Sequence, residues 1–226
     1  MVTFFAKGIN FLFGNVLQDK KVFLSGSLQY VQRKRSIDKN YFDYIRLSTL
    51  ELIAHEISEA GLKGSVAELG VYKGKFARYI NFYFPQRKLY LFDTFEGFDQ
   101  RDVQNEKARE FSSGSQDFTN TSVASVISRM PFPQQCTAVQ GFFPASAASV
   151  NDSFVFVSLD TDLYDPIYEG LNFFYPKLVK GGYLFVHDFN NDNYKGVRKA
   201  VEQFCAEQGI SFVPIPDFGG SVVIAK

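Results

Sequence analysis

Short apolar runs alternate with longer stretches of helical spacing along most of this chain. The apolar runs are rich in valine, leucine and phenylalanine, as strands buried on both faces of a sheet are. They lie at 65–69, 89–92, 137–140, 154–159 and 181–186. Apolar residues recur with helical spacing at 40–60, 75–84, 121–130, between Asp162 and Tyr175, and at 195–208. Repeated alternation of this kind predicts a doubly wound α/β fold with a mostly parallel sheet.

Two further apolar runs, 210–213 and 221–224, end the chain and are joined by a segment containing proline and glycine. Such a connection predicts a hairpin, so the last strand should run antiparallel to its neighbours. We therefore expect a seven-stranded sheet with one antiparallel edge. The long polar stretch between Phe98 and Asn120 shows little periodicity, and we expect it to be a loop beside the ligand site.

The first 40 residues differ from the rest, so we expect a helical extension or lid at 1–40 and the main domain at 41–226. Residues 1–17 are apolar but too short to span a bilayer, and they lack a signal-peptide cleavage site. We therefore expect a cytoplasmic protein without stable membrane insertion. An apolar helical stripe containing Phe5, Ile9 and Phe13 needs a cover. We expect this stripe to pack on the body of the protein or on a second subunit rather than on a membrane surface. Packing on a second subunit would make the protein a homodimer.

Charge and cysteine content narrow the class of ligand. The 226 residues contain 24 basic and 24 acidic side chains, so no global field recruits nucleic acid. Cys136 and Cys205 are the two cysteines, and their isolation argues against a disulfide scaffold or a thiolate zinc site. A small-molecule ligand is the expected partner.

A glycine turn follows the strand at 65–69, with Tyr72 between Gly70 and Gly74. Strand, glycine turn and helix together form a cradle for a nucleotide-type cofactor, although many α/β proteins place glycines there. Glu68 would repel a phosphate and attract an ammonium group, which favours S-adenosylmethionine over NAD. Asp93 lies 25 positions after Glu68, near the spacing at which an acid reaches the ribose hydroxyls.

Acidic residues also close two later strands of the predicted sheet. Asp160 follows the run 154–159 and Asp188 follows 181–186, so parallel packing brings the two carboxylates together. Their repulsion would be relieved by a hard divalent cation such as Mg²⁺, with His187 or Asn190 completing the ligands. The alternative is structural, with helix caps, turn residues and a core histidine at these positions.

Several motifs together resemble the macrocin O-methyltransferase (TylF-type) family of class I S-adenosylmethionine-dependent methyltransferases. They are VAELGVYKG at 66–74, LFDTFEG at 91–97, SLDTDLY at 158–164, YPKL at 175–178 followed by Gly181–Gly182, and HDF at 187–189. The resemblance runs from about Tyr44 to the last residue. It implies a Rossmann-like fold and methylation of sugar hydroxyls in natural products, using S-adenosylmethionine and a divalent metal, usually Mg²⁺.

The resemblance also implies roles for individual residues. Cofactor contacts are implied at Glu68, Gly70, Asp93, Thr94 and Phe95, beside Tyr72 and Gly74 of the same turn. Metal ligands are implied at Asp160 and Asp188, and Asp162 falls where the family has a proposed general base. His187 stands where members often have aspartate, and it can serve as the third metal ligand or as a base.

Two other functions compete with this expectation. An NAD-dependent sugar oxidoreductase would need a diphosphate-binding glycine turn, which the single acidic turn does not provide. A methyltransferase-like scaffold could instead serve as a non-catalytic binding subunit. Retention of buried acids such as Glu68 and Asp188 argues against that scaffold, because unpaired buried charges are costly without a ligand.

Overall fold

A computed structural model describes residues 2–20 and 43–226 of the chain, which divides into two units, Met1–Ile37 and Asp38–Lys226. The described part of the first unit is the helix α1 (Val2–Asp19). The side chains of Phe5 and Phe13 on this helix are more than half exposed. The homodimer that was expected to cover them stays a prediction. Within the described residues, none of the helices combines the length and apolar character that a membrane span requires. Residues 21–40, the rest of the predicted lid, lie outside the described residues.

The second unit is built on a seven-stranded sheet with the strand order β3-β2-β1-β4-β5-β7-β6. The strands are β1 (Ser65–Leu69), β2 (Leu89–Asp93), β3 (Cys136–Gln140), β4 (Phe154–Leu159), β5 (Leu178–Val186), β6 (Val213–Pro214) and β7 (Val222–Ala225). Strands β1 to β5 pair in parallel, whereas β7 runs antiparallel to β5 and to β6. The predicted fold class is confirmed. Every residue of β1 and β4 is buried, which explains why both strands are continuously apolar apart from a few small or functional positions.

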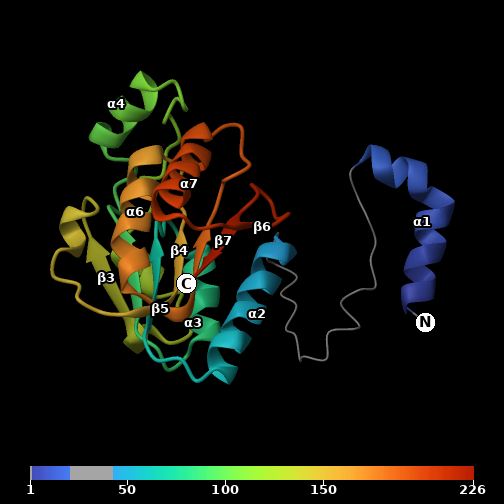
Figure 1. Ribbon diagram of the computed structural model, residues 1–226, viewed down its shortest axis with the longest axis horizontal. Helices are drawn as coiled ribbons and strands as arrows, with labels where there is room; N and C mark the ends of the chain where they lie inside the picture. Colours follow the sequence, from blue (N-terminus) through green and yellow to red (C-terminus); the bar gives the residue numbers. More distant parts are fainter. Residues whose placement is uncertain (1, 21–42) are drawn as a thin grey trace. The chain divides into compact units, whose positions relative to one another are not determined.

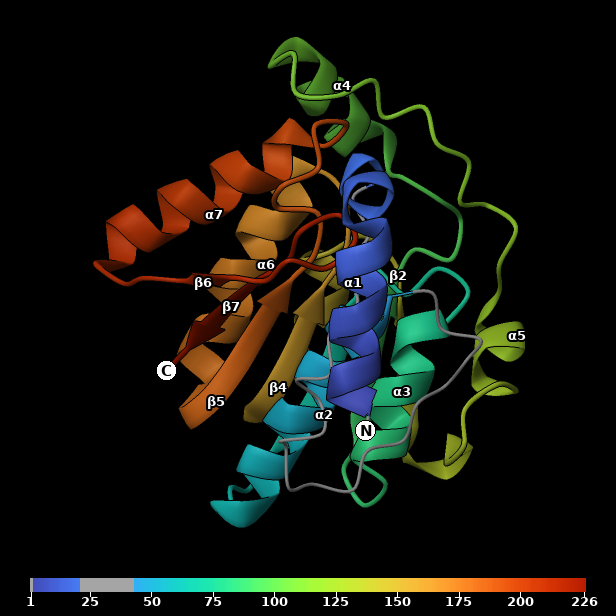
Figure 2. The same ribbon diagram turned by 90° about the vertical axis from the view of Figure 1, so that its right-hand side faces the viewer.

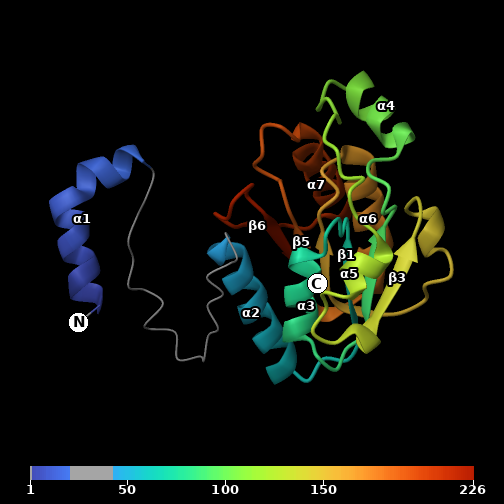
Figure 3. The ribbon, with the colours of Figure 1, turned by 180° about the vertical axis from the view of Figure 1, so that it is seen from behind.

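Helices cover both faces of this sheet, as Figures 1 and 3 show from opposite sides. The helices are α2 (Tyr44–Glu59), α3 (Lys75–Tyr83), α4 (Gln100–Ala108), α5 (Val123–Ile127), α6 (Tyr164–Lys177) and α7 (Lys195–Gln208). Residues of α6 and α7 share one hydrophobic core with the sheet, including Ile167, Leu171 and Val201. Residues of α2 and α3 form the other, including Leu50 and Ile80.

The parallel strands end at one edge of the sheet, where loops carry the candidate ligands. Figure 2 shows β4 and β5 side by side with their arrowheads at the same edge. Leu159 pairs with Val186, and the His187 N–H donates to the Leu159 carbonyl at 2.9 Å. The residues that follow β4 and β5 are therefore held together by the sheet itself.

Two expectations from the sequence are wrong in detail. The polar stretch after Phe98 contains the helix α4, capped at its N-terminus by Asp99. Only Val103 and Glu106 of that helix are buried, so it has no apolar stripe to reveal it. The apolar face predicted for α2 included Ile45, which is 42% exposed, whereas the neighbouring Arg46 is buried.

Candidate functional site

The glycine turn after β1 brings the ends of two strands into close contact. Gly70 has a φ of 85°, and its N–H donates to the Phe92 carbonyl at 2.9 Å. The Asp160 N–H donates to the Leu69 carbonyl at 2.8 Å. A Cβ on Gly70 would lie 2.1 Å from the Asp160 carbonyl oxygen, closer than any side chain allows. Only glycine lets β1 and β4 end so close together.

Asp93 organises the loops on both sides of the cradle. One carboxylate oxygen accepts the N–H groups of Val71 and Tyr72 at 2.7 and 2.8 Å, and the other accepts the Phe95 N–H at 2.7 Å. The oxygen that accepts the Phe95 N–H also lies 3.4 Å from the Thr94 hydroxyl. Asp93 therefore holds the loops on both sides of the cleft that it lines, and its hydrogen bond to a ligand stays a prediction.

An open cleft lies over this turn. Its lining includes Gly70, Tyr72, Phe92, Asp93, Thr94, Phe98, Asp102, Phe118, Phe142, Asp160 and Asp162. The Tyr72 ring contacts the Phe118 ring edge-on at a centroid distance of 4.9 Å, and Phe98 contacts Phe118 at 5.0 Å. The predicted cofactor residues Gly70, Tyr72, Asp93 and Thr94 thus lie together, beneath an aromatic wall.

Three other predicted cofactor residues do not line the cleft. Phe95 lies in the hydrophobic core and contributes its N–H to Asp93. Gly74 has a φ of 71° and is the N-cap of α3, where a Cβ would lie 2.9 Å from Met130 and Val126. Glu68 lies beneath the turn and is 1% exposed.

Burial of Glu68 has an electrostatic consequence. Desolvation, reinforced by the nearby charge of Asp160, raises the pKa of the Glu68 carboxyl well above its ordinary value. Its Oε2 has no hydrogen-bond partner among the described residues. Burial of Glu68 under the cradle therefore favours the neutral form of its carboxyl, and its predicted contact with the amino-acid end of the cofactor stays a prediction.

The acids after β4 and β5 come together around His187. Its Nδ1 lies 3.1 Å from Asp160 Oδ1 and 3.0 Å from Asp188 Oδ2. On the other side of the ring, Nε2 lies 2.9 Å from the Phe218 carbonyl oxygen. Asp188 also accepts the Asn191 amide at 2.8 Å. The three predicted metal ligands therefore form one cluster.

Arg46, which the sequence analysis missed, completes the cluster from α2. Its Nη2 lies 2.9 Å from Asp160 Oδ2, and its guanidinium carbon lies 3.9 Å from the centre of the Phe76 ring. The residue is 6% exposed. The sequence does contain an indication of this role. Arg46 lies four positions before the buried Leu50, so a charged side chain falls on the otherwise apolar face of the helix.

Charges in the cluster compensate one another. Burial alone would raise the pKa of the Asp160 carboxyl, but the positive charges of Arg46 and His187 hold it well below its usual range. Burial alone would lower the pKa of the His187 imidazole, but attraction by Asp160 raises it to about 10, with a further contribution from Asp188. Arg46 and His187 therefore favour the ionised form of Asp160, and Asp160 favours the protonated form of His187, whose proton a bound metal would replace.

Asp162 faces the cleft two residues beyond Asp160 and has a φ of 62°. Desolvation and the negative charges of Asp160 and Asp188 raise its pKa well above the ordinary value. A carboxyl of raised pKa is a stronger base once ionised than an ordinary one. Asp162 therefore lines the cleft where a base would be needed, and its role as general base stays a prediction.

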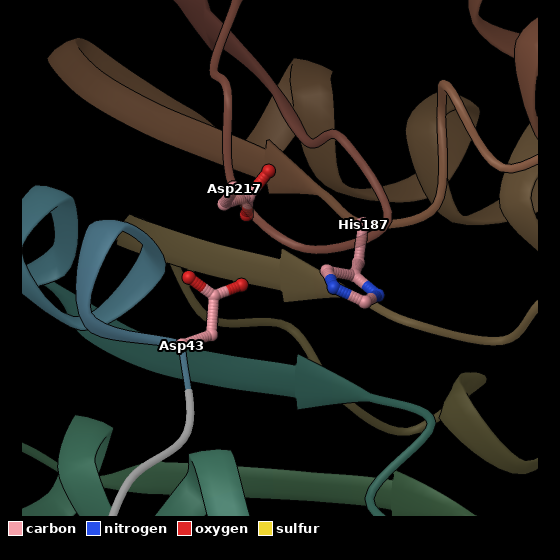
Figure 4. A group of neighbouring side chains, drawn as sticks. All are labelled: Asp43, His187 and Asp217. Atoms are coloured by element: carbon pink, nitrogen blue, oxygen red, sulfur yellow. The ribbon is translucent and has the colours of Figure 1, made fainter. Parts of the chain in front are cut away.

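A second group around His187 has a structural explanation. Figure 4 shows Asp43, His187 and Asp217 as neighbours, and their ligand atoms lie within 4.8 Å of one another. Asp43 accepts the N–H groups of Arg46 and Phe218, at 3.1 and 2.7 Å. Asp217 accepts the Ser221 N–H and hydroxyl, both at 2.5 Å. These two acids therefore cap α2 and the turn before β7.

Comparison with known families decides the identity of this site. Residues 29–218 match the macrocin-O-methyltransferase (TylF) family. The chain belongs to this family. It is accordingly an O-methyltransferase whose methyl donor is S-adenosylmethionine, and the NAD-dependent alternative is set aside. No curated protein sequence matches the chain.

Solved structures agree with a TylF-family fold. The O-methyltransferase NovP has a TM-score of 0.67 at 20% identity, covering 80% of this chain and 79% of its own. The calicheamicin methyltransferase CalS11 has a TM-score of 0.64 at 18% identity, covering 80% and 78%. An apo structure of CalS11, described as a TDP-rhamnose 3′-O-methyltransferase, has a TM-score of 0.56 at 16% identity, covering 80% and 78%. At these identities the likeness establishes the fold.

Within this TylF-family chain, the donor set fits a divalent cation. Oxygen atoms of Asp160 and Asp188 and a nitrogen of His187 lie within 4.8 Å of one another. Carboxylate and imidazole ligands together suit Mn²⁺, Zn²⁺ or Fe²⁺ as well as Mg²⁺. Asn190, the alternative third ligand, accepts a hydrogen bond from Arg198 instead.

The TylF-family site also contains residues that sequence patterns did not single out. Asp102 of α4 lines the cofactor cleft, and burial together with the charges of Asp99 and Asp165 raises its pKa to about 7. Tyr164, the last residue of the motif at 158–164, packs against Phe111 at a centroid distance of 5.5 Å. Asp102 was missed because the polar helix that carries it was taken for a loop.

Proposed function

We propose that the protein methylates a hydroxyl group of a sugar or glycosylated natural product with the help of a divalent metal. The observation that carries this proposal is the position of Asp160. Asp160 lines the cofactor cleft and also contacts His187, which lines a second cavity. A methyl donor in the cleft and an acceptor in the second cavity would meet at Asp160.

The acceptor class is supported by similar structures rather than by contacts in this chain. CalS11 is described as acting on TDP-rhamnose, and NovP as an O-methyltransferase. Both share the fold of this chain. A sugar hydroxyl is the acceptor that fits this set best.

Residues of the cleft supply the steps of methyl transfer. Gly70 and Asp93 hold the donor, and the wall formed by Tyr72, Phe98 and Phe118 excludes water. The hydroxyl oxygen forms a bond to the methyl carbon while the bond from that carbon to sulfur breaks, releasing S-adenosylhomocysteine. Asp162 accepts the hydroxyl proton, which makes the oxygen a better nucleophile.

Asp160, Asp188 and His187 would hold the metal. When bound, a divalent cation lowers the pKa of a coordinated hydroxyl group and fixes the position of its oxygen. Arg46 keeps Asp160 ionised and so ready to act as a ligand. Metal dependence, a cytoplasmic location and a homodimer are all predictions for this chain.

Mg²⁺ or Mn²⁺ should raise the melting temperature of the protein. A ligand at one hundred times its Kd stabilises the folded state by about 2.7 kcal/mol. The gain should vanish in Asp160→Asn and in Asp188→Asn and persist in Asp165→Asn, which changes an acid that pairs with Arg109. Differential scanning calorimetry makes the comparison. A shift that persists in both strand-end variants would rule out this metal site.

Asp93→Asn should weaken the binding of S-adenosylhomocysteine by about 5-fold to 150-fold, the effect of losing about 1–3 kcal/mol of hydrogen bonding to a charged partner. The variant removes negative charge from an acceptor shared by Val71, Tyr72 and the ligand. Isothermal titration calorimetry measures the affinity, and NAD serves as the control ligand that should not bind. Equal affinity in the variant would remove Asp93 from the cofactor site, and tight binding of NAD would overturn the proposed function.

A further inference from the structure

A second cavity opens next to His187, on the side of the sheet that carries α2 and α3. Its volume is about 660 Å³, within the range of roughly 300–1,000 Å³ that is common for small-molecule sites. The residues around it are Asp43, Arg46, Lys73, Gly74, Lys75, Arg78, Tyr79, Arg129, His187 and Phe218. All of them belong to the second unit of the chain.

The lining of this cavity is strongly basic. Among the described residues that line it, five are lysine or arginine and one, Asp43, is an acid. The carboxylate of Asp43 is already engaged by the N–H groups of Arg46 and Phe218. Arg46 is in turn paired with Asp160. Most of the unpaired positive charge of the cavity therefore belongs to its other lysine and arginine residues, Lys73, Lys75, Arg78 and Arg129.

These four cationic side chains have no carboxylate partner in the described part of the chain. Lys73, Lys75, Arg78 and Arg129 form no ion pair there, in contrast to Arg101 and Arg109, which do. Like charges that face one hollow repel one another, and a bound anion would relieve that repulsion. The overall chain is neutral, so this concentration of charge is local.

Backbone geometry adds to the positive potential. Lys73, Gly74 and Lys75 form the start of α3, and the N-cap Gly74 provides no side chain to bond the first N–H groups. Gly74 and Lys75 line the cavity, so the positive end of the helix dipole lies beside the lysines, although the N–H of Ala77 in the same first turn is bonded to Glu68. Arg129 is fixed at this wall because its Nη1 donates to the Lys73 carbonyl at 2.9 Å.

We propose that this cavity binds a phosphate or diphosphate group carried by the acceptor, so that the substrate is a phosphorylated or nucleotide-linked sugar. The inference rests on the proposed function and adds the substrate class. Four uncompensated cations exceed what one carboxylate would neutralise and are enough to balance the two to three negative charges of a diphosphate. Two of the four are arginines, whose planar donors bind phosphate oxygens in pairs.

The position of the cavity fits such a substrate. His187 lines it and lies 3.1 Å from Asp160, which lines the cofactor cleft. An acceptor anchored by its phosphate near Arg78 and Arg129 could extend its sugar towards Asp162. Anchoring through a remote group restricts the motion of the reacting hydroxyl, which is a large source of rate enhancement.

Titration calorimetry with inorganic pyrophosphate tests the proposal. The titration is done in EDTA, so that a metal cannot bring the anion to the acidic cluster. Arg78→Gln/Arg129→Gln should bind pyrophosphate at least about 10-fold more weakly than the wild type, as expected for losing two charged contacts. The matched control Lys63→Gln/Lys180→Gln also removes two charges, but at the opposite end of the strands, and should bind like the wild type.

Each outcome decides the inference. Pyrophosphate binding that is undetectable, or equally weakened by both double variants, would overturn it. Glucuronate binding as tightly as pyrophosphate would also overturn it, because the cavity would then be a carboxylate site. Titration of the same proteins with S-adenosylhomocysteine distinguishes failure of the phosphate site from failure of the proposed function. If S-adenosylhomocysteine binds and pyrophosphate does not, the methyltransferase proposal stands and only the phosphate site is ruled out.

Discussion

Replacing Asp162 by asparagine should reduce kcat for methyl transfer by about 10²-fold to 10⁴-fold, the usual contribution of a general base. The substitution keeps the size of the side chain and removes its ability to accept a proton. It leaves Asp160 and Asp188 in place, so the thermal response to a metal and the affinity for S-adenosylhomocysteine should be retained. Single-turnover kinetics with saturating donor measure the chemical step.

Asp165 provides the matched control for this variant. It lies three residues further on, in the first turn of α6, and its carboxylate is paired with Arg109. Asp165→Asn makes the same chemical change without touching the cleft, so its kcat should stay close to that of the wild type. If the two variants lost activity equally, the effect would come from folding of this segment and Asp162 would not be the base.

Substitution of Arg46 by methionine should lower the free energy of unfolding by about 3–5 kcal/mol, the cost of leaving one member of a buried ion pair without its partner. Methionine retains much of the packing against Phe76, so the loss reports mainly the charge on Asp160. Chemical denaturation measures the change. Arg46→Met/Asp160→Asn should be more stable than Arg46→Met alone, because it also removes a carboxylate that would otherwise keep only His187 as its positive partner.

The pH dependence of wild-type stability should show the same pairing. The pKa of Asp160 is lowered by folding, so its contribution is present above the unfolded value of about 3.9 and is lost as the pH falls. The pKa of His187 is raised to about 10, so its contribution is complete below about 6.5 and is lost as the pH rises through about 10. A double variant as unstable as Arg46→Met, with an unchanged pH profile, would contradict the ion-pair explanation.

The sheet could be predicted from the sequence because its strands are buried on both faces and therefore continuously apolar. The runs at 154–159 and 89–92 match β4 and β2 to within one residue. By contrast, α4 is stabilised by its cap Asp99 and buries only two side chains, so it left no hydrophobic pattern. Amphipathic periodicity identifies elements that pack against a core, and α4 barely does.

The acidic half of the site was predictable for a topological reason. Asp160 and Asp188 directly follow neighbouring strands, and adjacent parallel strands end together. The cationic half was not predictable, because Arg46 reaches Asp160 only through the packing of α2 on the sheet. Arg129 likewise reaches the Lys73 carbonyl only because the segment after α5 folds back against the glycine turn. Sequence order carries no signal for contacts that depend on how a helix docks.

The hydrogen bond between Asp43 and the Phe218 N–H joins residues 175 positions apart, and Arg46 reaches across 114 positions to Asp160. Contacts of such long range form late in folding, because closing the intervening loop costs entropy before any contact repays it. During synthesis at about 5–20 residues per second, Phe218 follows Asp43 by about 9–35 s. Until then the Asp43 carboxylate lacks the Phe218 N–H as a donor, although the pairing of β1 with β4 can already form. Asp43 and Phe218 both line the second cavity, so that cavity is complete only after the segment before β7 has been synthesised.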